Sequence, residues 1–284
     1  MSDPVPAGPN DFSGDVALVT GGGTGLGLAI SRGLAARGAR VVAASRNPAH
    51  HEAIRAEAAA KGWRVETRVL DVRDAVAVER AAAEIGAVDV LVNNAAGNFP
   101  CPAERLSANA WRSVVSIALD GTFYCSRYFG RGMIERGRGR ILNVVATYAT
   151  TGMPGVVHSA SAKAGVLAMT KTLAAEWARH GVRVNAIAPG PFESDGAAAN
   201  LWPDPAARER LRRAIPLGRF ATADEVAAHA IYLLSSACAF VTGECFVVDG
   251  GMSLPASPFL PSGAAARRGQ KPPLPEGDDP AGAG

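Results

Sequence analysis

Short apolar runs alternate along the chain with stretches of helical periodicity. Seven runs are rich in β-branched residues and nearly continuously apolar, which is typical of parallel strands buried on both faces. They cover residues 16–20, 40–44, 65–70, 88–92, 140–145, 182–188 and 245–248. Between them, helical spacing of apolar residues occurs around 26–37, 49–61, 74–85, 104–118, 121–136, 159–180 and 223–236. The alternation predicts an α/β fold with a seven-stranded parallel sheet, helices on both faces and right-handed crossovers.

The two ends of the chain differ from this pattern. Residues 1–13 contain three prolines, and residues 255–284 hold seven Pro, five Gly and six Ala. Such segments bury too little apolar surface to offset the entropy lost on ordering. We therefore expect disordered tails at 1–13 and 255–284. Because no repeat or linker divides the rest, we expect one folded domain over 14–254.

Charge and cysteine content exclude several classes of protein. The 29 Lys and Arg against 26 Asp and Glu give a net charge of +3, too small to indicate a nucleic-acid partner. The four cysteines lie far apart without a C-x-x-C pair, which argues against a metal site or disulfides and fits a reduced cytoplasm. No apolar stretch approaches the ~18 residues of a membrane span, and the N-terminus lacks a signal-peptide pattern. We predict a cytoplasmic protein without a membrane segment.

A glycine-rich loop follows the first predicted strand and opens the first predicted helix. Glycines allow a tight turn and a close backbone approach to a pyrophosphate, and the helix N-terminus offers free N–H groups to it. This position makes the loop a dinucleotide-binding signature and the sheet a doubly wound (Rossmann) domain. The predicted cofactor residues here are Gly21, Gly23, Thr24, Gly25, Leu26 and Gly27.

The end of the second strand indicates the cofactor. Sites that prefer NAD usually carry a carboxylate there, which accepts from the ribose hydroxyls. Here the strand ends Ala43-Ala44-Ser45-Arg46. Arg46 can bind a 2′-phosphate and Ser45 can donate to it, so the sequence favours NADP(H). The alternative is that Arg46 is a solvated loop residue.

Four motifs occur in order at spacings that resemble the short-chain dehydrogenase/reductase superfamily over 14–254. They are Thr20-Gly21-x-x-x-Gly25-x-Gly27, Asp71-Val72, Asn93-Asn94-Ala95-Ala96-Gly97 and Pro189-Gly190. The resemblance implies a homotetramer held through helices 104–136 and 159–180. It also implies cofactor contacts at Asp71, Val72, Asn94, Ala95, Ala96, Gly97, Pro189, Gly190, Pro191 and Phe192.

The usual catalytic groups of that superfamily are a Ser followed by Tyr-x-x-x-Lys, and only the lysine is in place. Lys163 matches it, which implies that it holds the nicotinamide ribose hydroxyls. Ser159 stands at the tyrosine position and Ala146 at the serine position. A serine hydroxyl is a poor substitute for a phenol beside a lysine, because its pKa lies far above 7. We expect Ser159 to hydrogen-bond a ligand rather than to act as a nucleophile.

Tyr148 lies fifteen residues before Lys163, on the predicted loop after the fifth strand. The arrangement resembles the 2,4-dienoyl-CoA reductases, in which Tyr precedes an S-A-S-A-K-A-G segment. The resemblance implies a reductase that uses NADPH on an acyl-CoA, with Tyr148 donating to the thioester oxygen. Asp120 stands where these enzymes have a second polar group, and either a catalytic or a supporting role is open to it.

Two further interpretations concern the substrate cleft. Asn98 and Phe99 are expected to line it, and His158 is expected at its rim rather than as a proton donor. Two rival functions remain open at this point. One is a short-chain carbonyl reductase or alcohol dehydrogenase in which Tyr148 is the acid. The other is an NADP-binding protein that has lost catalysis, as the missing Tyr and Ser would suggest.

Overall fold

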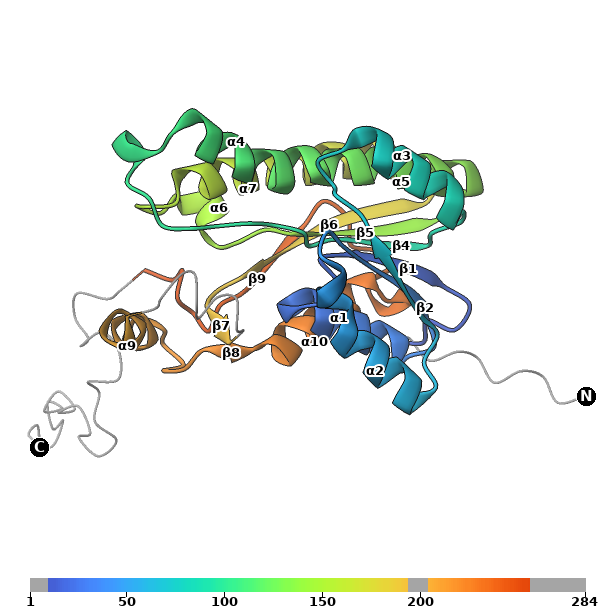
Figure 1. Ribbon diagram of the computed structural model, residues 1–284, viewed down its shortest axis with the longest axis horizontal. Coiled ribbons are helices and arrows are strands. Elements are labelled where there is room, and N and C mark those ends of the chain that lie inside the picture. Colours follow the sequence, from blue (N-terminus) through green and yellow to red (C-terminus); the bar gives the residue numbers. More distant parts are fainter. Residues whose placement is uncertain (1–9, 194–203, 256–284) are drawn as a thin grey trace, which may run out of the picture.

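The computed structural model describes residues 10–193 and 204–255, and a seven-stranded parallel sheet forms its centre (Figure 1). The prediction of an α/β doubly wound fold is confirmed. The strand order is β3-β2-β1-β4-β5-β6-β9, and every neighbouring pair is parallel. The strands are β1 (Val16–Thr20), β2 (Arg40–Ser45), β3 (Val65–Val69), β4 (Val90–Asn93), β5 (Gly139–Val144), β6 (Val182–Pro189) and β9 (Cys245–Val248).

Helices cover both faces of this sheet (Figure 1). One layer consists of α1 (Gly25–Ala35), α2 (Glu52–Lys61) and α10 (Ala223–Leu234). The opposite layer consists of α3 (Ala75–Ile85), α4 (Ala108–Val115), α5 (Gly121–Arg136) and α7 (Val157–Trp177). Within the described ranges, no helix is both long and apolar enough to cross a bilayer.

From β1 the chain first adds β2 and β3 on one side of the sheet, and it then adds β4, β5 and β6 on the other side. The order of the strands therefore switches direction between β1 and β4. Ligands of open α/β sheets bind in the crevice at such a switch point, beyond the carboxyl ends of the strands. A side chain of the β4 end bridges the two strands there. Asn94 donates from Nδ2 to the carbonyl of Thr20 at 3.0 Å, and the Asn94 N–H donates to the Thr20 hydroxyl at 3.0 Å.

The helix expected over 104–118 is divided in the structure. Ser107 caps α4 by accepting from the Ala110 N–H at 3.2 Å, and a 3-10 turn, Ala103–Arg105, precedes it. A π-helical turn, Ser116–Asp120, then leads directly into α5 without the break expected near residue 120. The cap fixes where α4 begins, and the π-turn changes the helical register after α4. Apolar periodicity reveals neither feature.

Four elements of the described ranges have no counterpart in the predicted pattern. Tyr148 opens a short helix, α6 (Tyr148–Thr151), instead of lying in a loop. Helix α9 (Pro205–Ala214) and a two-stranded sheet of β7 (Phe192–Glu193) and β8 (Ala221–Thr222) lie beyond the end of β6 (Figure 1). These elements extend the molecule on the side where the sheet carries its carboxyl ends.

The described part of the chain begins at residue 10, before the predicted domain boundary. Phe12 is fully buried in the core, its N–H donates to the Arg37 carbonyl at 2.9 Å, and Arg140 stacks on its ring. Phe12 thus packs with the sheet and helices, although it precedes the boundary that the sequence predicts after residue 13. The remaining tail residues, 1–9 and 256–284, lie outside the described part.

Candidate active site and cofactor cavity

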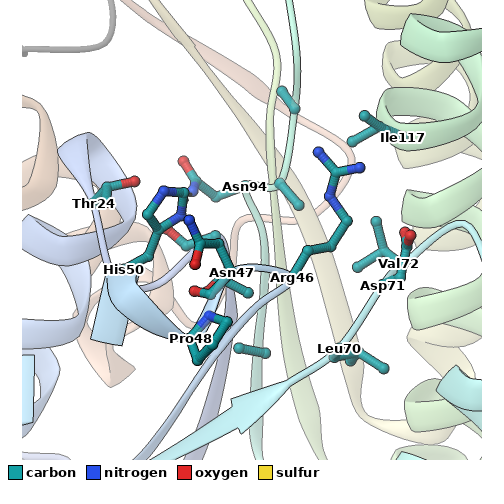
Figure 2. A pocket seen from close by; sticks show the side chains of 15 residues that line it. Thr24, Arg46, Asn47, Pro48, His50, Leu70, Asp71, Val72, Asn94 and Ile117 are labelled. Carbon is teal, nitrogen blue, oxygen red and sulfur yellow. Dashed lines mark hydrogen bonds between the residues drawn. The ribbon is translucent and has the colours of Figure 1, made fainter. Parts of the chain in front are cut away.

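A cavity of about 580 Å³ opens at the carboxyl ends of the first four strands (Figure 2). Its wall contains most of the residues predicted to bind the adenylate half of a dinucleotide. The lining residues are Gly21, Thr24, Ala44, Ser45, Arg46, Asn47, Pro48, His50, Leu70, Asp71, Val72, Asn94, Ala95, Ala96 and Ile117. Figure 2 shows Thr24 and His50 on one side of the cavity, and Asp71, Val72 and Ile117 on the other. The side chain of Arg46 extends between these two sides.

The predicted glycines shape the loop rather than line the cavity, except for Gly21. Gly21 and Gly25 have φ of +65° and +50°, a region that side chains rarely adopt. A Cβ on Gly23 would lie 2.0 Å from the His50 carbonyl oxygen, and one on Gly27 would lie 2.1 Å from that of Gly21. The loop is therefore packed against its neighbours at a distance that only glycine permits.

The start of α1 is equipped to receive an anion. Its N-cap residue, Thr24, makes no side-chain hydrogen bond to the helix, and the first turn carries no acidic residue. The first N–H groups of a helix have no partner within the helix, and the helix dipole favours negative charge near them. Together with the glycine loop and Arg46, this arrangement fits the pyrophosphate and 2′-phosphate of NADP(H).

Ser45 does not offer its proton to a ligand. Its hydroxyl donates to the Asn47 carbonyl at 2.9 Å and lies 2.8 Å from His51 Nε2. Since a hydroxyl has one proton, His51 is the donor in the second bond and Ser45 accepts it. This corrects the expectation that Ser45 donates to a 2′-phosphate. Both Ser45 and His51 are buried, and they hold the turn that carries Arg46.

Asp71 has an ionic partner beside the cavity. Its carboxylate pairs with Arg73 at 2.6 Å, which lowers the carboxyl pKa below its usual value despite partial burial. Arg46 adds a smaller effect in the same direction. Asp71 is therefore ionised at neutral pH, and its charge is largely compensated by Arg73 before any ligand binds.

A second cavity, of about 460 Å³, adjoins the first and shares Asn94 and Ala96 with it. It is lined mainly by apolar groups and contains the candidate catalytic residues. The sequence-predicted residues in its wall are Leu26, Asn94, Ala96, Gly97, Tyr148, Ser159, Lys163, Pro189, Gly190, Pro191 and Phe192. The wall also includes Asn98, as expected for the substrate cleft, whereas Phe99 is not part of it.

The hydroxyl of Tyr148 lies between two polar side chains. It is 3.1 Å from the Ser159 hydroxyl, and Asn98 donates to it from Nδ2 at 3.3 Å. The Phe99 N–H donates to Asn98 Oδ1 at 3.0 Å, so the amide nitrogen is the group left to face the phenol. Burial raises the pKa of Tyr148 above its usual value, although both hydrogen bonds act against the rise. The phenol is therefore protonated at neutral pH and can donate a hydrogen bond.

Lys163 is buried in the floor of the same cavity. Its ammonium group donates to the Val144 carbonyl at 2.6 Å, which ties α7 to the end of β5. Burial lowers its pKa to about 8. Lys163 therefore carries a positive charge at pH 7, close to the point at which it begins to lose its proton.

Two further candidate residues line neither cavity. Asp120 is half-buried at the end of the π-turn and is not among the residues of either cavity wall. His158 is not at a rim. It is fully buried, and its ring lies nearly perpendicular to that of Phe99 with 4.6 Å between the ring centres.

Several residues of the two cavities were missed by sequence reasoning. Leu211 enters the second cavity from α9, and Met153 and Met252 enter it from loops. A helix start signal did precede Leu211: Asp204 caps α9 by accepting from two backbone N–H groups, and Pro205 follows it at the first helical position. Asn47 and His50 join the first cavity through the turn after β2, for which the sequence offered no apolar pattern.

Comparison with known proteins places the chain in a family. The family model described as enoyl-(acyl carrier protein) reductase matches residues 21–253. A probable 2,4-dienoyl-CoA reductase of Bacillus subtilis is 44% identical over 85% of this chain and 98% of its own length. A short chain dehydrogenase of Bacillus anthracis is 45% identical, with a TM-score of 0.78 over 86% of this chain and 98% of that chain.

A further solved structure carries a cofactor. It is a gluconate 5-dehydrogenase of Burkholderia cenocepacia in complex with NADP and tartrate, 34% identical, with a TM-score of 0.81 over 87% of this chain and 98% of that chain. The relatives thus include enzymes named for different substrates and share one fold. The chain belongs to the short-chain dehydrogenase/reductase superfamily and is an oxidoreductase of that superfamily, as the sequence motifs predicted.

Proposed function

We propose that the protein is an NADPH-dependent reductase of 2,4-dienoyl thioesters, with an acyl-CoA as its substrate. The glycine loop, the start of α1 and Arg46 would hold the cofactor's adenylate half and pyrophosphate in the first cavity. Lys163 and the 189–192 segment would hold its nicotinamide end in the second cavity. The relative of Bacillus subtilis, named for this reaction, supports the assignment.

When bound, NADPH supplies a hydride. In a 2,4-dienoyl thioester, the hydride adds to the δ-carbon, and the electron pairs of the conjugated system shift toward the thioester oxygen to give a dienolate. A proton from water then adds to the α- or γ-carbon, so the substrate gains two hydrogens and the cofactor leaves as NADP⁺. The protein must therefore stabilise negative charge on an oxygen remote from the carbon that is attacked.

The proposal depends on the hydroxyl of Tyr148. Asn98 donates to its oxygen, and Ser159 can donate to the same atom, so the phenol proton remains free to point at the thioester oxygen. Because burial keeps the phenol protonated, Tyr148 acts as a hydrogen-bond donor to the dienolate. One such donor typically contributes about 3 kcal/mol to lowering a barrier of this kind.

Lys163 adds a positive charge to the same cavity. Its ammonium group would also bind the ribose hydroxyls of the nicotinamide, through the N–H bonds that it does not donate to Val144. Asp120 takes a supporting role in this account, because it lies outside both cavity walls. An ionised carboxylate near the dienolate would oppose its formation.

One relative favours a second candidate function, oxidation of a polyhydroxy acid, because it is named a gluconate 5-dehydrogenase. The wall of the second cavity argues for the thioester instead. Pro100, Met153, Leu211 and Met252 give it an apolar surface that suits a hydrocarbon chain. A sugar acid would need several polar partners for its hydroxyls, since polar groups buried without partners cost binding energy.

A substrate panel tests the proposal. NADPH oxidation is measured with 2,4-dienoyl-CoA thioesters of several chain lengths, with simple ketones and with 5-ketogluconate. Turnover of the dienoyl thioesters at least about a hundred-fold faster than of the ketones is expected, because only they use the apolar wall. Faster turnover of 5-ketogluconate would favour the second candidate. NADPH binding without turnover of any member would favour a protein that has lost catalysis.

We also propose that the protein assembles as a homotetramer through the α4, α5 and α7 layer. Trp111 on α4 and Phe123 on α5 leave large apolar side chains exposed, 36% and 41% respectively. Exposed aromatic side chains on neighbouring helices are typical of surfaces that other subunits cover.

A further inference from the structure

His158 is a buried polar side chain without an evident task in the proposed reaction. It is the second residue of α7 and is fully buried. Its Nδ1 accepts the Ser159 N–H at 2.7 Å, so the proton of the neutral ring is on Nε2. That nitrogen is buried and has no hydrogen-bond partner in the described part of the chain. The ring is therefore not placed to exchange a proton with a ligand.

A second contact of the ring is with the loop that follows β4. The planes of His158 and Phe99 meet at 84°, with 4.6 Å between the ring centres. This edge-to-face geometry is the one that aromatic pairs prefer. A backbone bond joins the same two segments nearby, since the Cys101 N–H donates to the Gly155 carbonyl at 2.7 Å. The start of α7 and the 98–101 loop are thus held together at two points.

These contacts form a closed ring around the Tyr148 hydroxyl. Phe99 holds the amide of Asn98 by its N–H, and Asn98 donates to Tyr148. Tyr148 pairs with the Ser159 hydroxyl, and His158 accepts the Ser159 N–H and packs on Phe99. Each partner of the phenol is therefore connected to His158, one through Phe99 and the other through its own backbone.

We propose that His158 is a positioning residue that fixes the direction of the Tyr148 hydroxyl by setting the separation of Asn98 and Ser159. The bond from the Ser159 N–H to Nδ1 orients the ring, and the packing of this ring against Phe99 in turn positions Phe99 and the neighbouring Asn98. The inference rests on the proposed function, in which Tyr148 donates to the substrate oxygen.

Three single variants separate the two contacts of the ring. His158→Asn keeps an acceptor near the position of Nδ1 and removes the ring that packs on Phe99. His158→Phe keeps an aromatic edge and removes the acceptor. Phe99→Leu removes the partner ring and leaves His158 unchanged, so it tests the same link even if the His158 variants fold poorly. The exposed His229, on α10, provides the matched control His229→Asn.

Turnover and cofactor binding give the first measurement. His158→Asn and Phe99→Leu are each expected to lower kcat roughly ten-fold, because small misplacement of a catalytic group is costly. The Kd for NADPH, measured by fluorescence, stays at the wild-type value. The double variant should be no slower than the slower single variant, since both changes break one link. Effects that multiply in the double variant would overturn the proposal.

A second measurement does not depend on the substrate. Fluorotyrosine is incorporated, and the ¹⁹F resonance of residue 148 is identified by its absence in Tyr148→Phe. The proposal requires this resonance to shift in His158→Asn, His158→Phe and Phe99→Leu, and to stay in place in His229→Asn. An unchanged resonance in the first three variants would overturn it. If wild-type enzyme reduces ketones rather than dienoyl thioesters, the proposed function fails, and the resonance still decides the role of His158.

Discussion

At the scale of single residues, the site is defined by a phenol that stands at an unusual place in the chain. The position four residues before Lys163 holds Ser159, and the phenol comes instead from Tyr148. The two hydroxyls nevertheless meet at 3.1 Å, in a cavity that also contains Lys163. The phenol thus comes from a different position in the sequence, and the fold brings it close to Ser159, the residue at the usual tyrosine position.

Removing the Tyr148 hydroxyl should affect turnover alone. Tyr148→Phe is expected to lower turnover of a 2,4-dienoyl-CoA by about a hundred-fold, because the dienolate loses a donor. NADPH affinity should stay nearly unchanged, as judged by fluorescence titration. Tyr232→Phe, at a tyrosine that is 45% exposed on α10, is the matched control. Normal turnover in Tyr148→Phe would remove this residue from the mechanism.

The ionisation of Lys163 should appear in the pH profile. Burial lowers its pKa to about 8, so kcat/KM for NADPH, which reports the free enzyme, should fall as the pH rises through that value. Lys163→Arg keeps a charge at high pH and should move the fall upward. Alkaline limbs that coincide in the two proteins would show that another group titrates.

The same lysine affects stability with a defined sign. Between about 8 and its ordinary pKa of 10.5, the unfolded chain holds a proton that the folded chain has released. The unfolded state thus binds more protons in this window, and the contribution of Lys163 to the free energy of unfolding rises with pH. At pH 7 the buried charge opposes folding, which is consistent with a residue kept for function.

At the scale of elements, the glycine loop and its neighbouring turn act as one unit. The backbone of Gly23 lies against the His50 carbonyl, and the turn after β2 is held by Ser45, His51 and Asn47. The sequence identified the loop, because glycines between a first strand and a first helix are typical of a dinucleotide-binding site. It misassigned Ser45, because the proton of a hydroxyl goes to whichever acceptor the folded turn brings near.

Substituting Gly23 tests this unit. Gly23→Ala would place a Cβ 2.0 Å from the His50 carbonyl oxygen, so the loop must move. We expect NADPH affinity to fall at least about ten-fold, with a loss of roughly 1–3 kcal/mol in unfolding free energy from overpacking. Calorimetric titration and denaturant unfolding measure the two effects.

Gly132→Ala, in α5, is the matched control. Its Cβ would meet only the flexible end of Arg136, at 3.2 Å, and alanine favours a helix by up to about 1 kcal/mol over glycine. NADPH affinity should be unaffected in this variant. Equal losses of affinity in both variants would contradict the role assigned to the close approach at Gly23.

At the scale of the whole molecule, the repeating strand and helix pattern was sufficient to predict the sheet, both helical layers and the edge where ligands bind. Elements that pack on that edge were not predictable in the same way. Helix α9 and the β7–β8 pair are not part of the alternating strand and helix pattern. Leu211 of α9 and Phe192 of β7 nevertheless line the second cavity. Their places depend on long-range packing, which a local pattern does not contain.

The proposed assembly can be tested by one surface change. Phe123→Asp puts a charge on the exposed face of α5, where burial against another subunit would be unfavourable. Light scattering should show a smaller particle for this variant than for the wild-type protein, for which we propose a tetramer. Val76→Asp, on α3, where the side chain is 71% exposed, should leave the mass unchanged. A mass unaffected by Phe123→Asp would place the subunit contact elsewhere.

The position of the transferred hydride tests the central claim most directly. The enzyme is supplied with NADPH that carries deuterium at its transferable position, together with equal amounts of a 2,4-dienoyl-CoA and 5-ketogluconate, and the products are analysed by mass spectrometry and NMR. A dienoyl reductase with Tyr148 at the thioester oxygen must place the deuterium on the δ-carbon of the acyl chain. Deuterium on the carbinol carbon of gluconate, with the acyl chain unlabelled, would contradict the account.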